Sequence, residues 1–171
     1  MTNSEQDRDL AAALVPRIEK PVVVIGVGSD LRGDDAFGVL AARELSALLG
    51  DDAPDVEVLE GGVAPENLAE RAARGSPRTV VLVDAADFEG EPGELRLVDP
   101  EELGWDLGGG THAPSLELLA TYLKGRCGAR TVMLAAQPAS TEFGSEISPA
   151  LKAAASRAAE VLRRALAACK P

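Results

Sequence analysis

The most constraining feature of the sequence is an unbroken apolar run, VVVIGV, over Val22–Val27. A strand with one face in water alternates polar and apolar residues, whereas a strand covered on both faces is apolar throughout. The segments Thr79–Asp84 and Thr131–Ala135 have the same character. The sequence therefore predicts a central parallel sheet with helices on both of its faces.

Helical patterns alternate with these strands. Helices are expected over four segments: Asp34–Leu49, Ala64–Arg74, Ser115–Leu123 and Ser148–Ala168. A short strand at Val56–Glu60 and an edge strand at Glu94–Val98 complete the pattern. We predict a three-layer α/β fold with a mostly parallel, twisted sheet of about five strands. Residues 1–20 are expected to form a loose N-terminal arm or short helix, and residues 21–171 a single domain.

The charge balance excludes some classes of partner. The chain has 171 residues, with 28 acidic and 17 basic side chains and a formal net charge of −11. Nucleic acids and anionic membranes attract clustered Lys and Arg, so neither is an expected partner. The acidic start, MTNSEQDRDL, does not resemble a secretion signal, and we expect a cytoplasmic protein. Cys127 and Cys169 are expected to remain reduced thiols.

The loop after the first strand is rich in carboxylates. Ligands of parallel α/β sheets bind beyond the carboxyl ends of the strands, where a glycine-rich turn often holds a phosphate. Here Leu31 stands where a dinucleotide-binding loop has its third glycine, and Asp30, Asp34 and Asp35 would repel a phosphate. We expect Asp34 to cap the following helix, which leaves Asp35 to face the cleft.

Two further residues can join Asp35 at this edge of the sheet. Asp84 ends the second apolar run, where an ionised carboxylate is costly unless it is paired, hydrated or bound to a cation. His112 is the only histidine and lies at a loop-to-helix junction in GGGTHAPS. Two carboxylates and one imidazole can hold a divalent ion such as Zn²⁺ or Ni²⁺ with a position left open. The structural alternatives are a turn-forming Asp84 and an incidental histidine.

Other hydrolytic arrangements stay open at this point. The chain has no HExxH metalloprotease motif and no GxSxG nucleophile elbow. A Cys–His pair would use Cys127 and His112, and a Ser–His–Asp triad would combine Ser29 or Ser115 with His112 and Asp84.

Five segments resemble motifs of one family: GVGSDLRGDDAFG, EGGVAPENL, VDAADFEGEPGELRLVDPEEL, GTHAPSLELL and LAAQP. The chain is similar to the hydrogenase maturation proteases, endopeptidases that trim the large subunit of [NiFe] hydrogenases. The resemblance runs from about Val22 to the final helix. It is closest to the branch that processes formate-hydrogenlyase-type hydrogenases.

The resemblance implies a site and a reaction. The family's metal-contacting residues fall on Asp35, Asp84 and His112, with Asp35 and Asp84 as the catalytic carboxylates of an aspartic-type endopeptidase. The implied metal is nickel that the precursor of the hydrogenase large subunit already carries, although other divalent ions can occupy the site. The implied reaction removes a C-terminal extension of that precursor, and the implied state is a monomer. The alternatives are a nickel-sensing assembly chaperone without proteolytic activity and a free-standing metallohydrolase.

Overall fold

The computed structural model describes residues 2–100, 104–105 and 112–169. The strands found there are β1 (Val22–Val27), β2 (Val56–Gly62), β3 (Thr79–Ala85), β4 (Leu95–Val98) and β5 (Arg130–Ala136). They form one five-stranded sheet in the order β2-β1-β3-β5-β4. Only the β4–β5 pair of this sheet is antiparallel. The predicted mostly parallel sheet with an edge strand near residue 95 is therefore confirmed.

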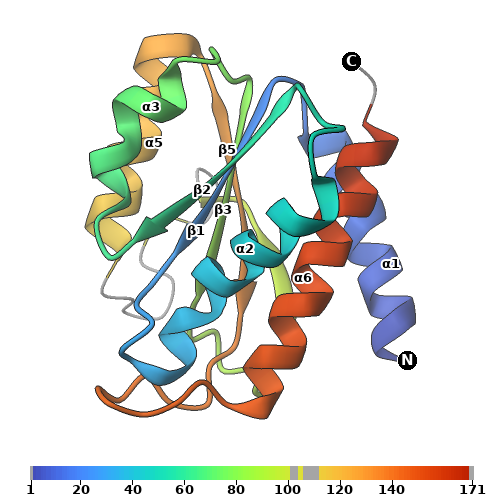
Figure 1. Ribbon diagram of the computed structural model, residues 1–171, viewed down its shortest axis with the longest axis vertical. Helices are drawn as coiled ribbons and strands as arrows, with labels where there is room; N and C mark the ends of the chain where they lie inside the picture. Colours follow the sequence, from blue (N-terminus) through green and yellow to red (C-terminus); the bar gives the residue numbers. More distant parts are fainter. Residues whose placement is uncertain (1, 101–103, 106–111, 170–171) are drawn as a thin grey trace.

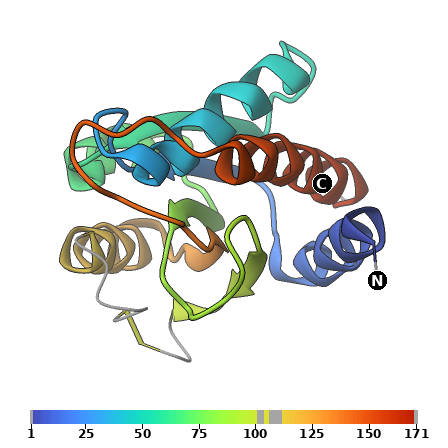
Figure 2. The ribbon, with the colours of Figure 1, turned by 90° about the horizontal axis from the view of Figure 1, so that it is seen from below.

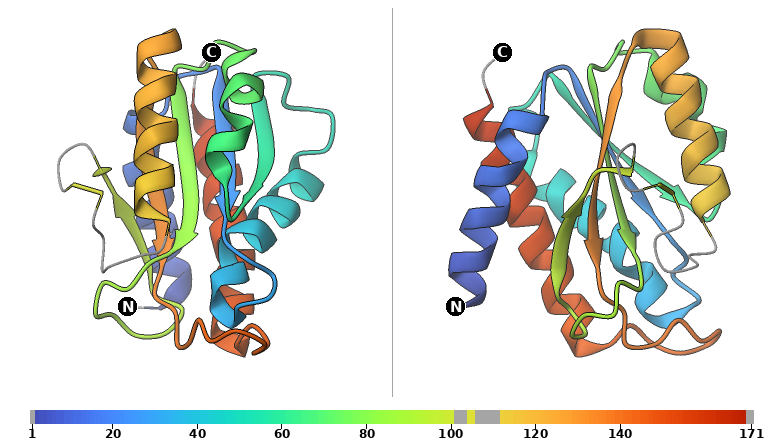
Figure 3. Two further views of the ribbon diagram at one scale, coloured as in Figure 1. Left: turned by 90° about the vertical axis from the view of Figure 1, so that its left-hand side faces the viewer. Right: turned by 180° about the vertical axis from the view of Figure 1, so that it is seen from behind.

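Helices cover both faces of the sheet. They are α1 (Asn3–Leu14), α2 (Phe37–Leu49), α3 (Ala69–Ala73), α5 (Ala113–Cys127) and α6 (Pro149–Ala168). Helices α1, α2 and α6 lie on one face, and α3 and α5 on the other (Figures 1 and 3). An apolar core fills each side, which explains why every residue of β1 is buried. Among the described residues, no helix is long and apolar enough to cross a membrane.

Two predicted helices begin as 3-10 turns. The segment predicted as one helix from Asp34 consists of the turn η2 (Gly33–Ala36) followed by α2. The segment predicted from Ala64 consists of the turn η3 (Pro65–Leu68) followed by the short helix α3. In both cases the turn directly follows the loop that leaves a strand, so the chain tightens there before the regular helix starts.

The N-terminal segment is a helix that joins the core. The side chain of Thr2 and that of Glu5 form a capping box that starts α1. Leu14 is fully buried, and Arg157 of α6 donates two hydrogen bonds of 2.7 and 3.0 Å to the carboxylate of Asp7. Figure 2 shows α1 lying alongside α6. Of the two alternatives predicted for residues 1–20, the short helix is the one observed, and the domain division at residue 20 stays a prediction.

The strand order reverses between β1 and β3. The chain runs from β1 to β2 on one side of β1, and then to β3 on its other side. Helix α2 approaches the sheet closely at this reversal, because a Cβ on Gly38 would lie 2.1 Å from the Val83 carbonyl oxygen and 2.3 Å from that of Val27. Only glycine permits this approach. The residues just before α2 are thereby held over the carboxyl ends of β1 and β3, where α/β sheets bind ligands.

Candidate metal site at the edge of the sheet

The three predicted ligands meet at this edge, and each comes from a different layer. Asp35 lies in η2, just before α2 on one face of the sheet. Asp84 belongs to β3 in the sheet itself, and His112 directly precedes α5 on the other face. All three side chains are buried, and one ligand atom of each lies within 4.8 Å of the other two. The structure therefore brings together the residues that the sequence singled out.

Asp35 and His112 are in direct contact. Nε2 of His112 lies 3.2 Å from Oδ1 of Asp35 and 3.3 Å from Oδ2. An ionised carboxylate only accepts hydrogen bonds, so Nε2–H of the imidazole is the donor. Oδ2 of Asp35 also accepts a 2.8 Å hydrogen bond from the backbone N–H of Ser29. The two side chains thus orient one another, and the β1–α2 loop fixes the carboxylate.

This contact moves the pKa values of both groups. Burial acts to raise the pKa of Asp35, but the hydrogen bond and charge of His112, with the Ser29 N–H, outweigh burial and lower it. The hydrogen bond to Asp35 raises the pKa of His112 against the opposing effect of burial, and the charge of Asp84 adds to the rise. A cation bound between these groups would replace the shared proton, so its binding would release a proton.

Asp84 is the least satisfied of the three. Its Oδ1 is buried and has no hydrogen-bond partner, and the side chain is 4 % exposed. Burial raises the pKa of Asp84 to about 7, an effect that the charge of His112 opposes and that of Asp35 reinforces. A buried acceptor without a partner costs free energy unless something binds it. A carboxylate with an unpartnered oxygen, close to an imidazole and a second carboxylate, fits a divalent cation with oxygen and nitrogen ligands.

The predicted capping role of Asp34 is wrong. Neither η2 nor α2 has a side-chain cap. The Asp34 carboxylate instead accepts hydrogen bonds from the backbone N–H groups of Ala139 (2.7 Å), Ser140 (3.2 Å) and Ser148 (2.7 Å). Its partners lie more than 100 positions away in the sequence, so no local pattern could have indicated them. Asp34 ties the β1–α2 loop to the loop between β5 and α6, and its neighbour Asp35 points to the site.

None of the competing nucleophiles forms a hydrogen bond with His112 among the described residues. Cys127 is the last residue of the 15-residue helix α5 and His112 directly precedes its first, so about 20 Å of helix separates the two. The Cys127 thiol donates to the carbonyl of Leu123. Oγ of Ser29 accepts a hydrogen bond from the N–H of Leu31. Among the hydrogen bonds of the described residues, none joins His112 to a serine hydroxyl, and His112 is oriented by Asp35 instead.

Sequence reasoning also overlooked Arg32 as a neighbour of the site. Its positive charge lowers the pKa of both Asp35 and His112. The only available signal was its place in the same acidic loop, three residues before Asp35.

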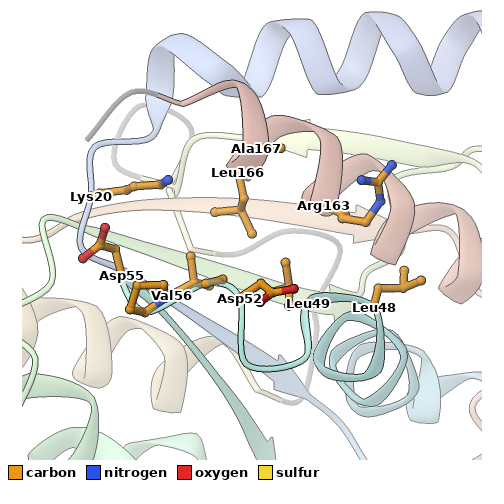
Figure 4. Close-up of a pocket in the computed structure, with 11 residues that line it drawn as sticks. Lys20, Leu48, Leu49, Asp52, Asp55, Val56, Arg163, Leu166 and Ala167 are labelled. Atoms are coloured by element: carbon orange, nitrogen blue, oxygen red, sulfur yellow. The ribbon is translucent and has the colours of Figure 1, made fainter.

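A separate hollow of about 260 Å³ lies at the opposite end of the sheet. Lys20, Asp55 and Val56, near the starts of β1 and β2, face Leu166 of α6 across it (Figure 4). The buried Asp–Asp–His cluster lies at the carboxyl ends of the strands, so this hollow is not part of the candidate site.

Comparison with known proteins identifies the family. The family model for HycI, hydrogenase maturation protease, matches residues 39–165. The chain belongs to the hydrogenase maturation protease family. The match includes Asp84 and His112, and Asp35 lies just before it.

Individual members of the hydrogenase maturation protease family are similar in sequence and in fold. The chain is 34 % identical over 118 residues to the hydrogenase 3 maturation protease of Escherichia coli K12, covering 68 % of this chain and 72 % of that protein. The crystal structure of a [NiFe] hydrogenase maturation protease, HycI, from Thermococcus kodakarensis KOD1 is 38 % identical with a TM-score of 0.80. That match covers 93 % of this chain and 99 % of that one.

The solution structure of the endopeptidase HycI from Escherichia coli is also similar to this chain, with 30 % sequence identity and a TM-score of 0.67. It covers 78 % of this chain and 83 % of that one. These findings confirm the predicted family, its α/β fold and its peptidase class.

Proposed function

We propose that this protein removes the C-terminal extension of a [NiFe] hydrogenase large-subunit precursor after nickel has been inserted. Family membership supports the peptidase reaction, and the names of its relatives point to hydrogenase as the substrate. The observation that carries the proposal is the buried group of Asp35, Asp84 and His112, with an orphaned oxygen on Asp84. Such a group suits an ion presented by another protein, because three donors leave coordination positions for the precursor's own ligands.

Each of the three residues would have its own role in binding the ion and cleaving the peptide bond. Asp35, whose pKa is lowered, supplies a permanent negative charge for the ion. His112 adds a nitrogen ligand once its proton has left. Asp84 would hold the ion through its unpartnered Oδ1, and its carboxylate is also our candidate for the general base in the attack on the peptide bond. A bound divalent ion also polarises a neighbouring carbonyl or water, which would help the attack on the peptide bond.

The proposal also covers the compartment, the oligomeric state and the partners of the protein. We propose a cytoplasmic protein that acts as a monomer on a protein substrate. Its net charge of −11 supports the exclusion of nucleic acid and anionic lipid as partners. The two thiols, Cys127 and Cys169, which form no disulfide, agree with a reducing compartment.

Mass spectrometry of the precursor tests this function. Nickel-loaded and nickel-free precursor from the same organism are each incubated with the protein, and intact masses are followed over time. We expect the C-terminal peptide to be lost from the loaded form alone. A stable complex without any loss of mass would indicate the chaperone, and cleavage of both forms by a protein that retains its own metal would indicate the free-standing metallohydrolase.

A further inference from the structure

Two loops border the site and are joined to each other by backbone hydrogen bonds. They are the β1–α2 loop, residues 28–36, and the β5–α6 loop, residues 137–148. The N–H of Gly33 donates to the carbonyl of Ser145 at 3.0 Å, and the N–H of Gly144 donates to the carbonyl of Leu31 at 2.8 Å. Figures 1 and 2 show the second loop running beside the first at the carboxyl edge of the sheet.

Asp34 makes this pair of loops a single rigid unit. It is 1 % exposed, and its carboxylate accepts three backbone hydrogen bonds from the far loop. Its own N–H donates to the carbonyl of Ser140 at 3.0 Å. Hydrogen bonds to a buried charge are among the stronger ones in proteins. The backbone of both loops is therefore held in place before any partner arrives.

The joined loops carry the two most exposed large apolar side chains of the described chain. Phe143 is 74 % exposed and Leu31 is 64 % exposed. Both residues lie at the backbone contact between the loops, since Leu31 accepts the hydrogen bond from the residue after Phe143. An apolar pair kept in water on a rigid backbone suits a binding contact, because little further ordering is needed on association.

We propose that Leu31 and Phe143 form the contact through which this protein holds the folded large-subunit precursor. The inference rests on the proposed function. Asp35 follows Leu31 by four residues in the same loop, so a protein that brings its metal to Asp35 approaches the joined loops that carry Leu31 and Phe143. A few residues that become fully buried at the centre of a contact supply most of the affinity of a protein interface. The proposed contact requires an apolar surface on the precursor beside the metal that it carries.

Steady-state kinetics with single variants test this contact. Leu31→Ser and Phe143→Ser are each expected to raise KM for nickel-loaded precursor by about tenfold or more and to leave kcat unchanged, because binding is lost while the metal ligands stay in place. Leu48→Ser is the matched control, since Leu48 is 51 % exposed but lies in the last turn of α2, at the opposite end of the sheet. An unchanged KM in both loop variants, or an equal rise in the control, overturns the inference.

Failure of the proposed function can be distinguished from failure of the proposed contact. If the unsubstituted protein does not cleave the precursor, the proposed function fails, and the affinity of the same variants for loaded precursor then decides the contact. Weaker binding by both loop variants supports it, and unchanged binding overturns it. Sedimentation of the protein alone gives the other check, because a dimer that Phe143→Ser dissociates would assign this surface to a second copy of the chain.

Discussion

His112 Nε2 lies 3.2 Å from Oδ1 of Asp35, although 77 positions separate the two residues in the sequence. Neither side chain has room for a bulk-water shell, since the side chains of His112 and Asp35 are 10 % and 8 % exposed. The third member, Asp84, has an oxygen within 4.8 Å of both but no hydrogen-bond partner of its own for Oδ1. Within the cluster, Asp35 and His112 are hydrogen-bonded to each other, whereas Oδ1 of Asp84 has no hydrogen-bond partner. This arrangement is expected of a site that binds a ligand.

Replacing Asp35 by Asn should abolish processing and preserve the fold. The amide keeps an oxygen for the Ser29 N–H but lacks the negative charge that binds the cation. We expect cleavage of loaded precursor to fall by at least about 100-fold, as judged by intact-mass time courses. Asp30→Asn is the control, since Asp30 is half exposed and pairs with Arg43 at the surface. Normal processing by the Asp35→Asn variant would show that Asp35 is not a ligand of the metal.

Replacing the neighbouring residue, Asp34, should lower the stability of the fold, whereas replacing Asp35 should affect activity. Asp34→Ala removes a buried carboxylate and leaves the backbone N–H groups of Ala139, Ser140 and Ser148 without their acceptor. We expect the free energy of unfolding to fall by on the order of 3 kcal/mol, measured by urea denaturation. Asp35→Asn in the same assay should lose far less. A loss below about 1 kcal/mol for Asp34→Ala would show that the loop connection contributes little to stability.

Stability of the metal-free protein should decrease as the pH rises from about 4 to 7. Because burial raises the pKa of Asp84 to about 7, the folded protein keeps a proton in this range that the unfolded chain has released. The raised pKa of His112 acts in the same direction as the pH passes through it, whereas the lowered pKa of Asp35 reduces stability only in acid.

Asp84→Asn tests this pH dependence. The variant cannot ionise at residue 84, so it should match the unsubstituted protein near pH 4, below the pKa of an unfolded Asp, and exceed its free energy of unfolding at pH 8. The expected gain is on the order of 2–4 kcal/mol. Denaturant unfolding at several pH values from about 4 to 8 measures it. Parallel pH profiles for the two proteins would contradict the raised pKa.

The N-terminal helix should contribute to global stability. Leu14 is completely buried against the α6 side of the core, and its truncation leaves a cavity. Leu14→Ala is expected to lower the free energy of unfolding by about 2–4 kcal/mol in urea. Leu118→Ala, at a position 60 % exposed on α5, serves as the control and should change little. Equal stability of the two variants would show that the segment is a dispensable arm.

The strands and the site were predictable because their signals are local or topological. Apolar runs marked β1 and β3, and the rule that ligands bind at the carboxyl ends of parallel strands placed Asp35 and Asp84 together. His112 was harder to place. The lone histidine was selected by its junction with a helix, and the family resemblance supported the choice. The first turn of α5 then brought it to Asp35.

What the sequence could not predict depends on contacts between distant segments. The partners of Asp34 lie in the β5–α6 loop, so the residue looked like an ordinary helix cap. The N-terminal helix has a polar, Ala-rich sequence, and its burial depends on the shape of α6 beside it. The glycine-rich residues 106–111 before His112, predicted to form a loop, lie outside the described residues.

The placement of one of the three cluster residues in each layer makes the candidate site depend on native packing. A sliding of α5 or α2 over the sheet by a single ångström would separate His112 from Asp35, even with every helix and strand intact. A compact intermediate with native secondary structure but loose side chains would therefore have no site. Metal-dependent activity would appear only in the last step of folding, when both cores have closed against β3.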